Sequence, residues 1–248
     1  MSKDYLKLGV NIDHVATLRN ARGGKYPDVL RAAKFVKEFG AERVTIHLRE
    51  DRRHIMDQDV HNICEWGGLP VNFEIAATDE MLAIGLKYKP DTILIVPENR
   101  MERTTEGGLN VIAKKDVIGA MIREFKKAQS KVSLFIEADE AQIKMAASIG
   151  AHSIEIHTGE YCDAITEGDQ AKADKCLEKI QNGAKLGKSL GLEIHAGHGI
   201  TYESVTPIAA IAEITELNIG HFLVAEAVFV GLEQSIGEMR RLMDLARA

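Results

Sequence analysis

The sequence is poor in the residues that mark disulfide-bonded or membrane proteins. It has three cysteines, and Cys64, Cys162 and Cys176 lie far apart with no C-x-x-C pair. This usage favours reduced thiols over a disulfide framework. No apolar run approaches the ~18 residues of a membrane-spanning helix, and the N-terminus has no apolar signal core. We therefore expect a globular protein with a cytoplasmic location.

A strong charge of one sign is also missing, as are linkers, repeats and low-complexity stretches. The 248 residues carry a net charge of −6, which gives no reason to expect binding to nucleic acid or to a membrane. The hydrophobic content of 45% is enough for one large core. We expect a single domain over residues 1–248.

Strand-like segments alternate with helical patterns along the chain. Apolar residues at helical spacing follow Pro27-Asp28, Thr78 and Asp139, and amphipathic helices are expected over Asp169–Leu190 and from Gln234 onward. The expected strands are Leu6–Asp13, Arg43–Arg49, Val71–Ile75, Thr92–Pro97, Lys131–Glu137, Ser153–Thr158, Leu192–Ala196 and His221–Ala225.

This order of elements predicts an α/β fold, a (β/α)8 TIM barrel. The connection Val205–Thr215 looks short for a helix. A doubly wound open sheet is the main alternative, but its strands would be apolar on both faces. An antiparallel sheet with a wet face would not need connections of helix length.

Several expected strands are polar on one face. Thr45, His47 and Arg49 alternate with apolar residues, and Glu74 and Glu155 have the same setting in their own strands. A closed barrel turns this face into the lumen, where unpaired ionisable groups are costly. A self-satisfied polar core and an active site both fit such a lumen. The active site is favoured because barrel chemistry collects at the C-terminal ends of the strands.

Acids, imidazoles and arginines gather at these strand ends. Arginines and glycines in the adjoining loops suit phosphate esters, which bind guanidinium groups and backbone N–H groups. The segment Thr104–Gly108 reads either as a lid or as a turn. The strand-end residues are Asn11, Asp13, His14, His47, Arg49, Glu74, Glu98, Glu137, Glu155, His157, His198 and His221, and the loops add Arg19, Arg22, Arg52, Arg53, His54, Gly199 and Gly220.

The histidines and acids also raise the question of a metal site. Spaced ligand pairs such as H-E-x-x-H are absent, and so are a serine nucleophile elbow and a G-x-G-x-x-G turn after the first strand. We predict no metal. His61, His152 and His195 are expected to be structural or supporting residues.

The strand-end motifs resemble the pyridoxine 5'-phosphate synthase family of vitamin B6 biosynthesis. The resemblance covers the chain from about residue 6 onward. Its motifs are Leu8–Gly23, Thr45–Ile55, Asn72–Glu74, Thr104–Gly108, Ser133–Asp139, Ile154–Gly159, Ala196–Gly199 and Leu217–His221. Asn110 and His195 depart from it, because the family pattern leads us to expect Asp and Asn there.

The resemblance implies a homo-octameric barrel without metal or organic cofactor. The family's enzymes are transferase-type, ring-closing synthases that condense 3-amino-2-oxopropyl phosphate with 1-deoxy-D-xylulose 5-phosphate. The products are pyridoxine 5'-phosphate, inorganic phosphate and water. Matched by motif, His47 and Glu74 resemble general bases, His198 resembles a general acid, and Glu155 resembles a residue that stabilises a transition state.

By the same resemblance, two groups of residues bind the two phosphorylated substrates. Asn11, Arg22, Gly199, Gly220 and His221 correspond to the amino-ketone phosphate site, and Asp13, His14, Arg49, His54 and Thr104 to the deoxyxylulose phosphate site. The residues alone leave two alternatives open, a metal-dependent aldolase or isomerase for sugar phosphates and a regulatory barrel that binds a phosphometabolite. Phosphorylated small molecules are the expected partners in every case.

Overall fold

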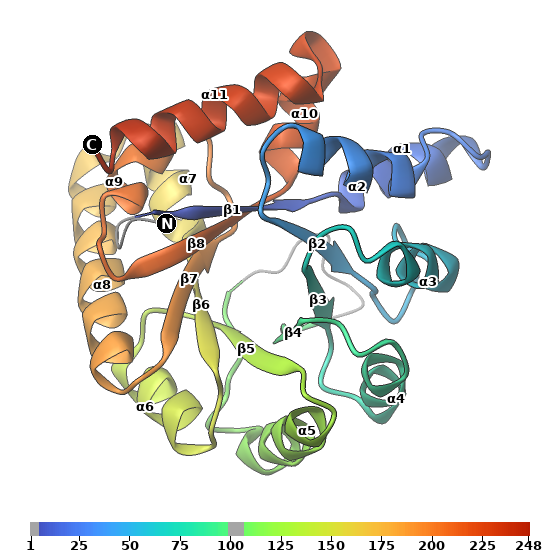
Figure 1. Ribbon diagram of the computed structural model, residues 1–248. Coiled ribbons are helices and arrows are strands. Elements are labelled where there is room, and N and C mark those ends of the chain that lie inside the picture. The colour runs from blue at the N-terminus through green and yellow to red at the C-terminus, as the bar shows by residue number, and fades with distance from the viewer. Residues whose placement is uncertain (1–4, 99–106) are drawn as a thin grey trace.

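The computed structural model describes residues 5–98 and 107–248 and shows a closed barrel of eight parallel strands with helices around it (Figure 1). Each strand pairs with the next in the sequence, and β1 pairs with β8 to close the barrel. The (β/α)8 prediction is therefore confirmed. The strands are β1 Lys7–Asn11, β2 Arg43–His47, β3 Val71–Ile75, β4 Thr92–Ile95, β5 Lys131–Ile136, β6 Ser153–His157, β7 Glu193–Gly197 and β8 Ile214–Ile219.

Helices connect the strands, and several begin where the sequence supplies a capping side chain. Asp28, Thr78, Asp139 and Asp169 each accept a hydrogen bond from the backbone N–H three residues later. The helices are α1 Asp13–Arg22, α2 Val29–Glu38, α3 Asp57–Trp66, α4 Asp79–Tyr88, α5 Lys115–Lys127, α6 Glu140–Ser148, α7 Gly159–Glu167, α8 Gln170–Ser189, α9 Val205–Ala209, α10 His221–Val230 and α11 Leu232–Leu245.

The predicted eighth strand, His221–Ala225, is wrong. Those residues begin helix α10, and β8 is Ile214–Ile219. A run as apolar as His221–Val230 fits a buried strand or a helix equally well, because it has no periodicity that separates the two. The short connection that we noted before the eighth strand is α9, a helix of five residues. Gly220 and His221 still follow a strand end, as the prediction for the site requires.

The two faces of the strands bury different kinds of side chain. Apolar residues point outward under the helices, and Gly187 of α8 lets that helix approach Ile154 and Ile194 closely. Polar side chains fill the lumen, where Arg43, Thr45, Asn72, Glu155, His195, Glu216 and Asn218 are all buried. The lumen is apolar beside β4 and β5, where Leu94, Val96 and Phe135 form a cluster of their own.

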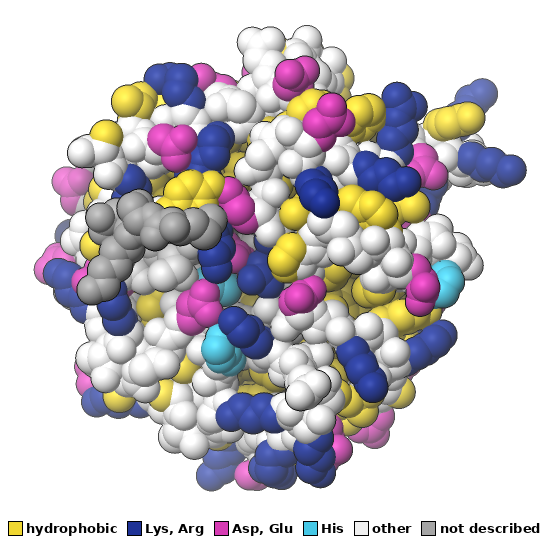
Figure 2. All heavy atoms as spheres, in the orientation of Figure 1, with side chains coloured by type: hydrophobic (Ala, Val, Ile, Leu, Met, Phe, Trp, Pro, Cys, Tyr) yellow, Lys and Arg dark blue, Asp and Glu magenta, His cyan; other side chains and the backbone are white. Residues whose placement is uncertain are grey.

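The lumen residues bond to one another across the barrel. The Arg43 guanidinium donates to Glu216 (2.9 Å) and to Thr92 (2.8 Å), and Thr45 donates to Asn218 (3.2 Å). Charged and histidine side chains also gather over the centre of the barrel in the space-filling view (Figure 2). The polar core thus satisfies much of its own hydrogen bonding, which offsets the cost of burying it.

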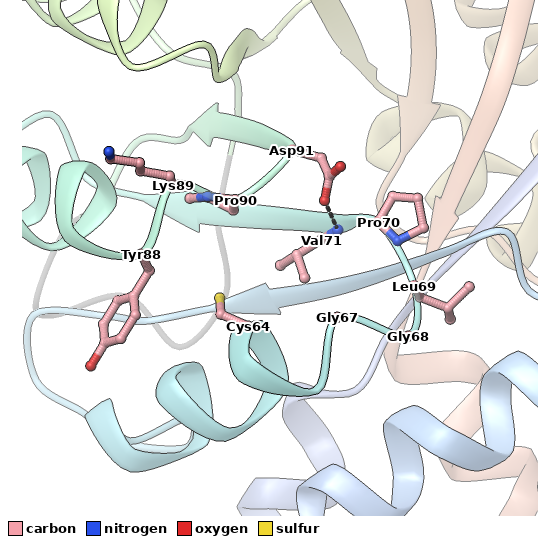
Figure 3. A pocket seen from close by; sticks show the side chains of 10 residues that line it. All are labelled: Cys64, Gly67, Gly68, Leu69, Pro70, Val71, Tyr88, Lys89, Pro90 and Asp91. Atoms are coloured by element: carbon pink, nitrogen blue, oxygen red, sulfur yellow. Dashed lines mark hydrogen bonds between the residues drawn. The ribbon is translucent and has the colours of Figure 1, made fainter.

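A cavity of about 370 Å³ lies where β3 and β4 begin (Figure 3). Asp91 accepts a hydrogen bond from the Val71 backbone N–H (2.9 Å), and burial raises the pKa of the neighbouring Cys64 thiol to about 11. Because barrel enzymes act at the opposite end of the strands, we assign this cavity no chemistry. In the described ranges 5–98 and 107–248, no helix combines the length and apolarity needed to cross a bilayer.

Candidate active site

Asp13 joins the C-terminal ends of β1 and β2. Its carboxylate accepts the backbone N–H of His47 (2.8 Å) and the side-chain N–H of Asn11 (2.9 Å). Asn11 in turn accepts the backbone N–H of Asp13 (2.8 Å). Asp13 is also the first residue of α1. The first two strand ends are therefore held in a fixed relation.

His47 lies between two carboxylates. Its Nδ1 is 3.5 Å from Glu74 Oε2, and its Nε2 is 3.5 Å from Glu98 Oε2. The side chains of His47 and Glu98 are 5% and 1% exposed, so water screens these charges weakly. An imidazole held in this way can take up a proton from one side and pass it on at the other.

The two carboxylates beside His47 are shifted in opposite directions. Burial, helped by the nearby charges of Asp13 and Glu155, holds the pKa of Glu74 well above its ordinary value. Burial also opposes ionisation of Glu98, but contact with His47 outweighs it and lowers the pKa of Glu98. Pairs of acids with separated pKa values are what acid–base catalysis requires.

Glu155 lies deeper in the lumen, on β6. It accepts a hydrogen bond from Asn218 Nδ2 (2.7 Å), and its side chain is almost completely buried. Burial raises its pKa to about 7, against the lowering effect of His195 and of the Asn218 bond. A Cβ on Gly197 would overlap the Glu155 carboxylate, so the glycine makes room for it. Glu155 is thus fixed in place and titrates near neutral pH.

His198 follows β7 in a conformation that is unusual for its residue type. Its φ of 77° lies in the left-handed region, which costs a non-glycine residue about 1–3 kcal/mol and is typical of functional sites. Thr158 Oγ1 donates to the carbonyls of Gly197 (2.8 Å) and His198 (2.6 Å) and holds the turn. Burial, and then the neighbouring His157, lower the pKa of His198 to about 4.

His157 and Glu137 stand beside His198. His157 Nδ1 is 2.8 Å from Glu137 Oε1, and its ring centre is 4.9 Å from that of His198. Burial disfavours the ionised form of Glu137, but the bond to His157 outweighs it and lowers the pKa. The pair closes the β5–β6 side of the mouth.

Glycines and histidines line the mouth between β8 and β1. A Cβ on Gly220 would lie 2.9 Å from Asn11 Cβ, so only glycine lets these strand ends approach. Gly220 directly precedes α10, whose first backbone N–H groups suit an anion. His221 forms an edge-on ring contact with His14 (4.7 Å), and burial, followed by His221, lowers the pKa of His14.

Most of the loop arginines are paired with acids of their own. Arg19 makes two hydrogen bonds to Asp59, and Arg53 bonds to Asp51. Arg52 likewise bonds to Asp57 and Glu80. Carboxylates already bond to the guanidinium groups of these three arginines, and the phosphate-binding role expected of the loop arginines stays a prediction. Arg49 is different in that it is buried beside Glu98 and Asp51.

Comparison with known proteins places the chain in a family. The model of the family described as Pyridoxal phosphate biosynthesis protein PdxJ matches residues 8–245. Proteins named pyridoxine 5'-phosphate synthase from Roseobacter denitrificans and Ruegeria pomeroyi are 57% and 55% identical to this chain. These alignments cover 98% and 100% of both sequences. The chain belongs to the PdxJ family.

Two solved structures with a similar fold are more distant in sequence. A 4-hydroxy-2-oxoglutarate aldolase structure aligns with a TM-score of 0.61 at 13% identity and covers 97% of this chain and 94% of its own. A phosphoribosyl anthranilate isomerase gives 0.57 at 11% identity, with 96% and 98% covered. At this level of sequence identity, the structural similarity shows only that this PdxJ family member has the same barrel fold.

The structure brings most of the predicted site residues to one mouth of the PdxJ barrel. His54 lies 5.9 Å from His47, ring centre to ring centre, and accepts the backbone N–H of Ile55 through Nδ1. Burial lowers the pKa of His54, although Asp13 opposes the shift. Arg22 is an exception, because it is exposed at the far end of α1, at the edge of the molecule (Figure 1). Thr104 lies outside the described residues.

Three further residues of the mouth received no role from the resemblance. Glu98, Glu137 and His157 were visible in the sequence only as polar residues at strand ends. Their partners are 51, 20 and 20 residues away in the sequence, respectively, so no local motif could join them. The signal that could have found them is the strand-end position itself.

Proposed function

We propose that this chain is a pyridoxine 5'-phosphate synthase, which condenses 3-amino-2-oxopropyl phosphate with 1-deoxy-D-xylulose 5-phosphate. The observation that carries the proposal is the ring of histidines and glutamates in the mouth of a PdxJ-family barrel, with His47 between Glu74 and Glu98. Joining an amine to a ketone, eliminating phosphate and closing an aromatic ring needs proton transfers at several atoms. Each transfer needs a group within ~3 Å, so one acid–base pair cannot reach them all.

The proposed roles follow the state of each group. Glu74 and His47 act as bases, since each can accept a proton that the other side chain or solvent then removes. Glu155 lies in the lumen below the bound substrate and stabilises positive charge that develops during condensation. The reaction needs no metal or organic cofactor in this scheme.

His198 acts as the acid once a substrate is bound. In the free protein its low pKa leaves the ring neutral at pH 7. A phosphate dianion beside the ring would raise that pKa, because a nearby opposite charge favours the protonated form. Binding of the phosphorylated substrate would then load the acid that protonates the leaving group.

We propose two phosphate sites in the mouth. One consists of Asn11, Gly199, Gly220 and His221, where backbone N–H groups and the start of α10 face the anion. The other consists of Asp13, His14, Arg49, His54 and Thr104, in which the buried guanidinium of Arg49 supplies the charge.

We also propose that the protein works as a homo-oligomer, an octamer built as a tetramer of dimers, in the cytoplasm. Val228 and Phe229 of α10 are 68% and 85% exposed, and Leu18 of the neighbouring α1 is 51% exposed. An apolar surface of this kind suits a second copy of the chain. Arg22 lies on the same side of the molecule at the end of α1, and we propose that it serves the mouth of the adjacent copy. Size-exclusion chromatography of a Phe229→Glu variant tests this, since a smaller particle is expected.

The synthase activity is tested by incubating the purified, chelator-treated protein with both substrates. Pyridoxine 5'-phosphate and inorganic phosphate should form in equal amounts. His47→Asn and Glu74→Gln should each lower kcat by about 100-fold or more while the protein stays folded. An inert wild-type protein would refute the proposal.

A metal-dependent aldolase is the second candidate, because Asp13, His47 and His54 offer ligand atoms that all lie within 4.8 Å of one another. Ligand atoms on one zinc ion would be about 3–3.5 Å apart, so the three side chains would have to move closer together. A stoichiometric divalent ion in the purified protein, with activity lost on chelation, would favour this candidate.

A further inference from the structure

His195 is a buried histidine at a position where the family pattern leads us to expect asparagine. It lies on β7 with its side chain in the lumen, and its exposed fraction is 3%. In the barrel ladder it pairs with Glu155 of β6 on one side and with Glu216 of β8 on the other. A residue predicted to be structural therefore borders a residue to which we assign a role in the reaction.

Each nitrogen of the His195 ring faces a carboxylate. Nε2 is 3.4 Å from Glu193 Oε1, and Nδ1 is 3.8 Å from Glu216 Oε1. The β7–β8 pairing skips Thr215, and this irregularity brings Glu216 opposite His195 in the lumen. An imidazole with a carboxylate near both nitrogens, here the buried Glu216 and the half-buried Glu193, is favoured as the imidazolium, because only the charged ring carries a proton on each.

The surrounding charges favour a cation at this position. Glu155 and Glu216 are buried, and Arg43, which bonds to Glu216, is the cation opposite them. Glu193 is also 3.2 Å from His152, 3.8 Å from Lys131 and 3.9 Å from Lys7. These three groups are 38% to 52% exposed, so solvent screens them far more than it screens His195.

We propose that His195 is a positioning residue for the synthase reaction, an imidazolium between Glu193 and Glu216 that favours the ionised form of the Glu155 carboxylate. This inference rests on the proposed function and deepens it, since it says how Glu155 can stabilise positive charge although it is buried. An asparagine at this position would bring no charge.

The directions of the two pKa shifts agree with this geometry. Burial alone would lower the pKa of His195, but Glu216 and Glu193 outweigh it, and the pKa is raised. Burial raises the pKa of Glu155 to about 7, and the charge of His195 is the foremost influence that lowers it. Glu155 is thus near its midpoint at neutral pH, where the loss of one positive charge has the greatest effect.

The first test is the pH profile of kcat/KM for wild type, His195→Asn and His195→Lys. Neighbouring strands lie about 5 Å apart, and a unit charge at such a distance shifts a pKa by about two units at an effective dielectric near 20. In His195→Asn the acid limb should move to higher pH by about that amount, with KM unchanged on the alkaline plateau. His195→Lys should restore most of the shift, which a purely structural role would not predict.

His152→Asn is the matched control, because it removes a histidine that contacts the same Glu193 but is 40% exposed. Its profile should coincide with that of the wild type. A His195→Asn profile without a shift, or an equal shift in His152→Asn, would overturn the inference.

A second test does not depend on activity. The histidine ring signals of the wild-type protein are followed by NMR across pH, and His195 is assigned by the signal missing in His195→Asn or His195→Lys. Its midpoint should lie above the ordinary value of about 6.5. A midpoint below that value would overturn the inference even in an active enzyme. A wild-type protein that shows the high midpoint but makes no product would refute the proposed function instead and leave the charge assignment supported.

Discussion

Gly197 is the position at which the smallest change should disturb the site most. It ends β7 between the strands that carry Glu155 and Asn218. A Cβ at Gly197 would overlap Glu155 Oε1 and would lie 2.8 Å from the backbone oxygen of Asn218. Because β6 and β8 flank the position on both sides, the added methyl group cannot be relieved by moving away from either. The Glu155 side chain would have to rotate and leave Asn218.

The expected cost of Gly197→Ala follows from these contacts. Inserting a methyl group into a packed interior costs about 1–3 kcal/mol, and losing the bond between Asn218 and the Glu155 carboxylate adds about 1.5–3 kcal/mol. Domains are stable by about 5–15 kcal/mol, so the variant should still fold. A displacement of a catalytic group by about 1 Å costs about 100-fold in rate, and we expect a fall in kcat of that size. KM should change little, since the proposed phosphate sites lie elsewhere.

The assay is steady-state formation of pyridoxine 5'-phosphate, with thermal unfolding of the same preparations. Gly237→Ala in α11 is the matched control, because a Cβ there would meet open space. It should leave kcat unchanged and stabilise the helix by about 0.5–1 kcal/mol. A Gly197→Ala enzyme with wild-type kcat would refute the assignment of Glu155 to the reaction.

Three further variants test the charges of the lumen. The pKa of Glu155 is raised from 4.5 to about 7, so the folded state holds the proton longer and about 3 kcal/mol of stability is lost as pH rises through that window. Glu155→Gln should remove this loss. The check is urea unfolding of the wild type and of Glu155→Gln at about pH 5 and about pH 8. If the free energy of unfolding changes between the two pH values by the same amount in both proteins, the reasoning is wrong. Arg43→Met leaves the buried Glu216 without its nearest cation and should cost about 3–5 kcal/mol in urea unfolding. Adding Glu216→Gln should recover most of it, and a single variant as stable as wild type would contradict the pairing. Glu98→Gln should lower kcat by about tenfold or more, because His47 loses the carboxylate at its Nε2; an unchanged kcat in the same assay would remove Glu98 from the mechanism.

The sequence was sufficient to predict the barrel and the polar lumen. Strand alternation has a period of two, so His47, Glu74 and Glu155 each had to lie on the polar face of their own strand. The number and length of the connections then closed the sheet and turned that face inward. The mouth could be anticipated for the same reason, since parallel strands end at one edge.

Two features could not be predicted because they depend on contacts between distant parts of the chain. The apolar run of α10 packs against α11 and α1, and its own pattern does not distinguish a helix from a buried strand. The loop arginines looked like anion ligands, yet Arg19 finds Asp59 on α3, 40 residues further along. A cluster of like charges in the sequence gives no indication of the acids that will neutralise it.

The acids near the strand starts lie beside cations, whereas Glu74, near the strand ends, lies beside other acids. Near the strand starts, Arg43 faces the buried Glu216 and His195 faces the half-buried Glu193, so each anion has a cation close by. Near the strand ends, burial and then the like charges of Asp13 and Glu155 raise the pKa of Glu74. A barrel with all of its acids beside cations would be stable and inert, because each carboxylate would stay ionised across the working range. Reactivity requires that some acids remain without a cation beside them. The stability lost at those acids can be tolerated because the lumen residues near the strand starts hold their charges in pairs.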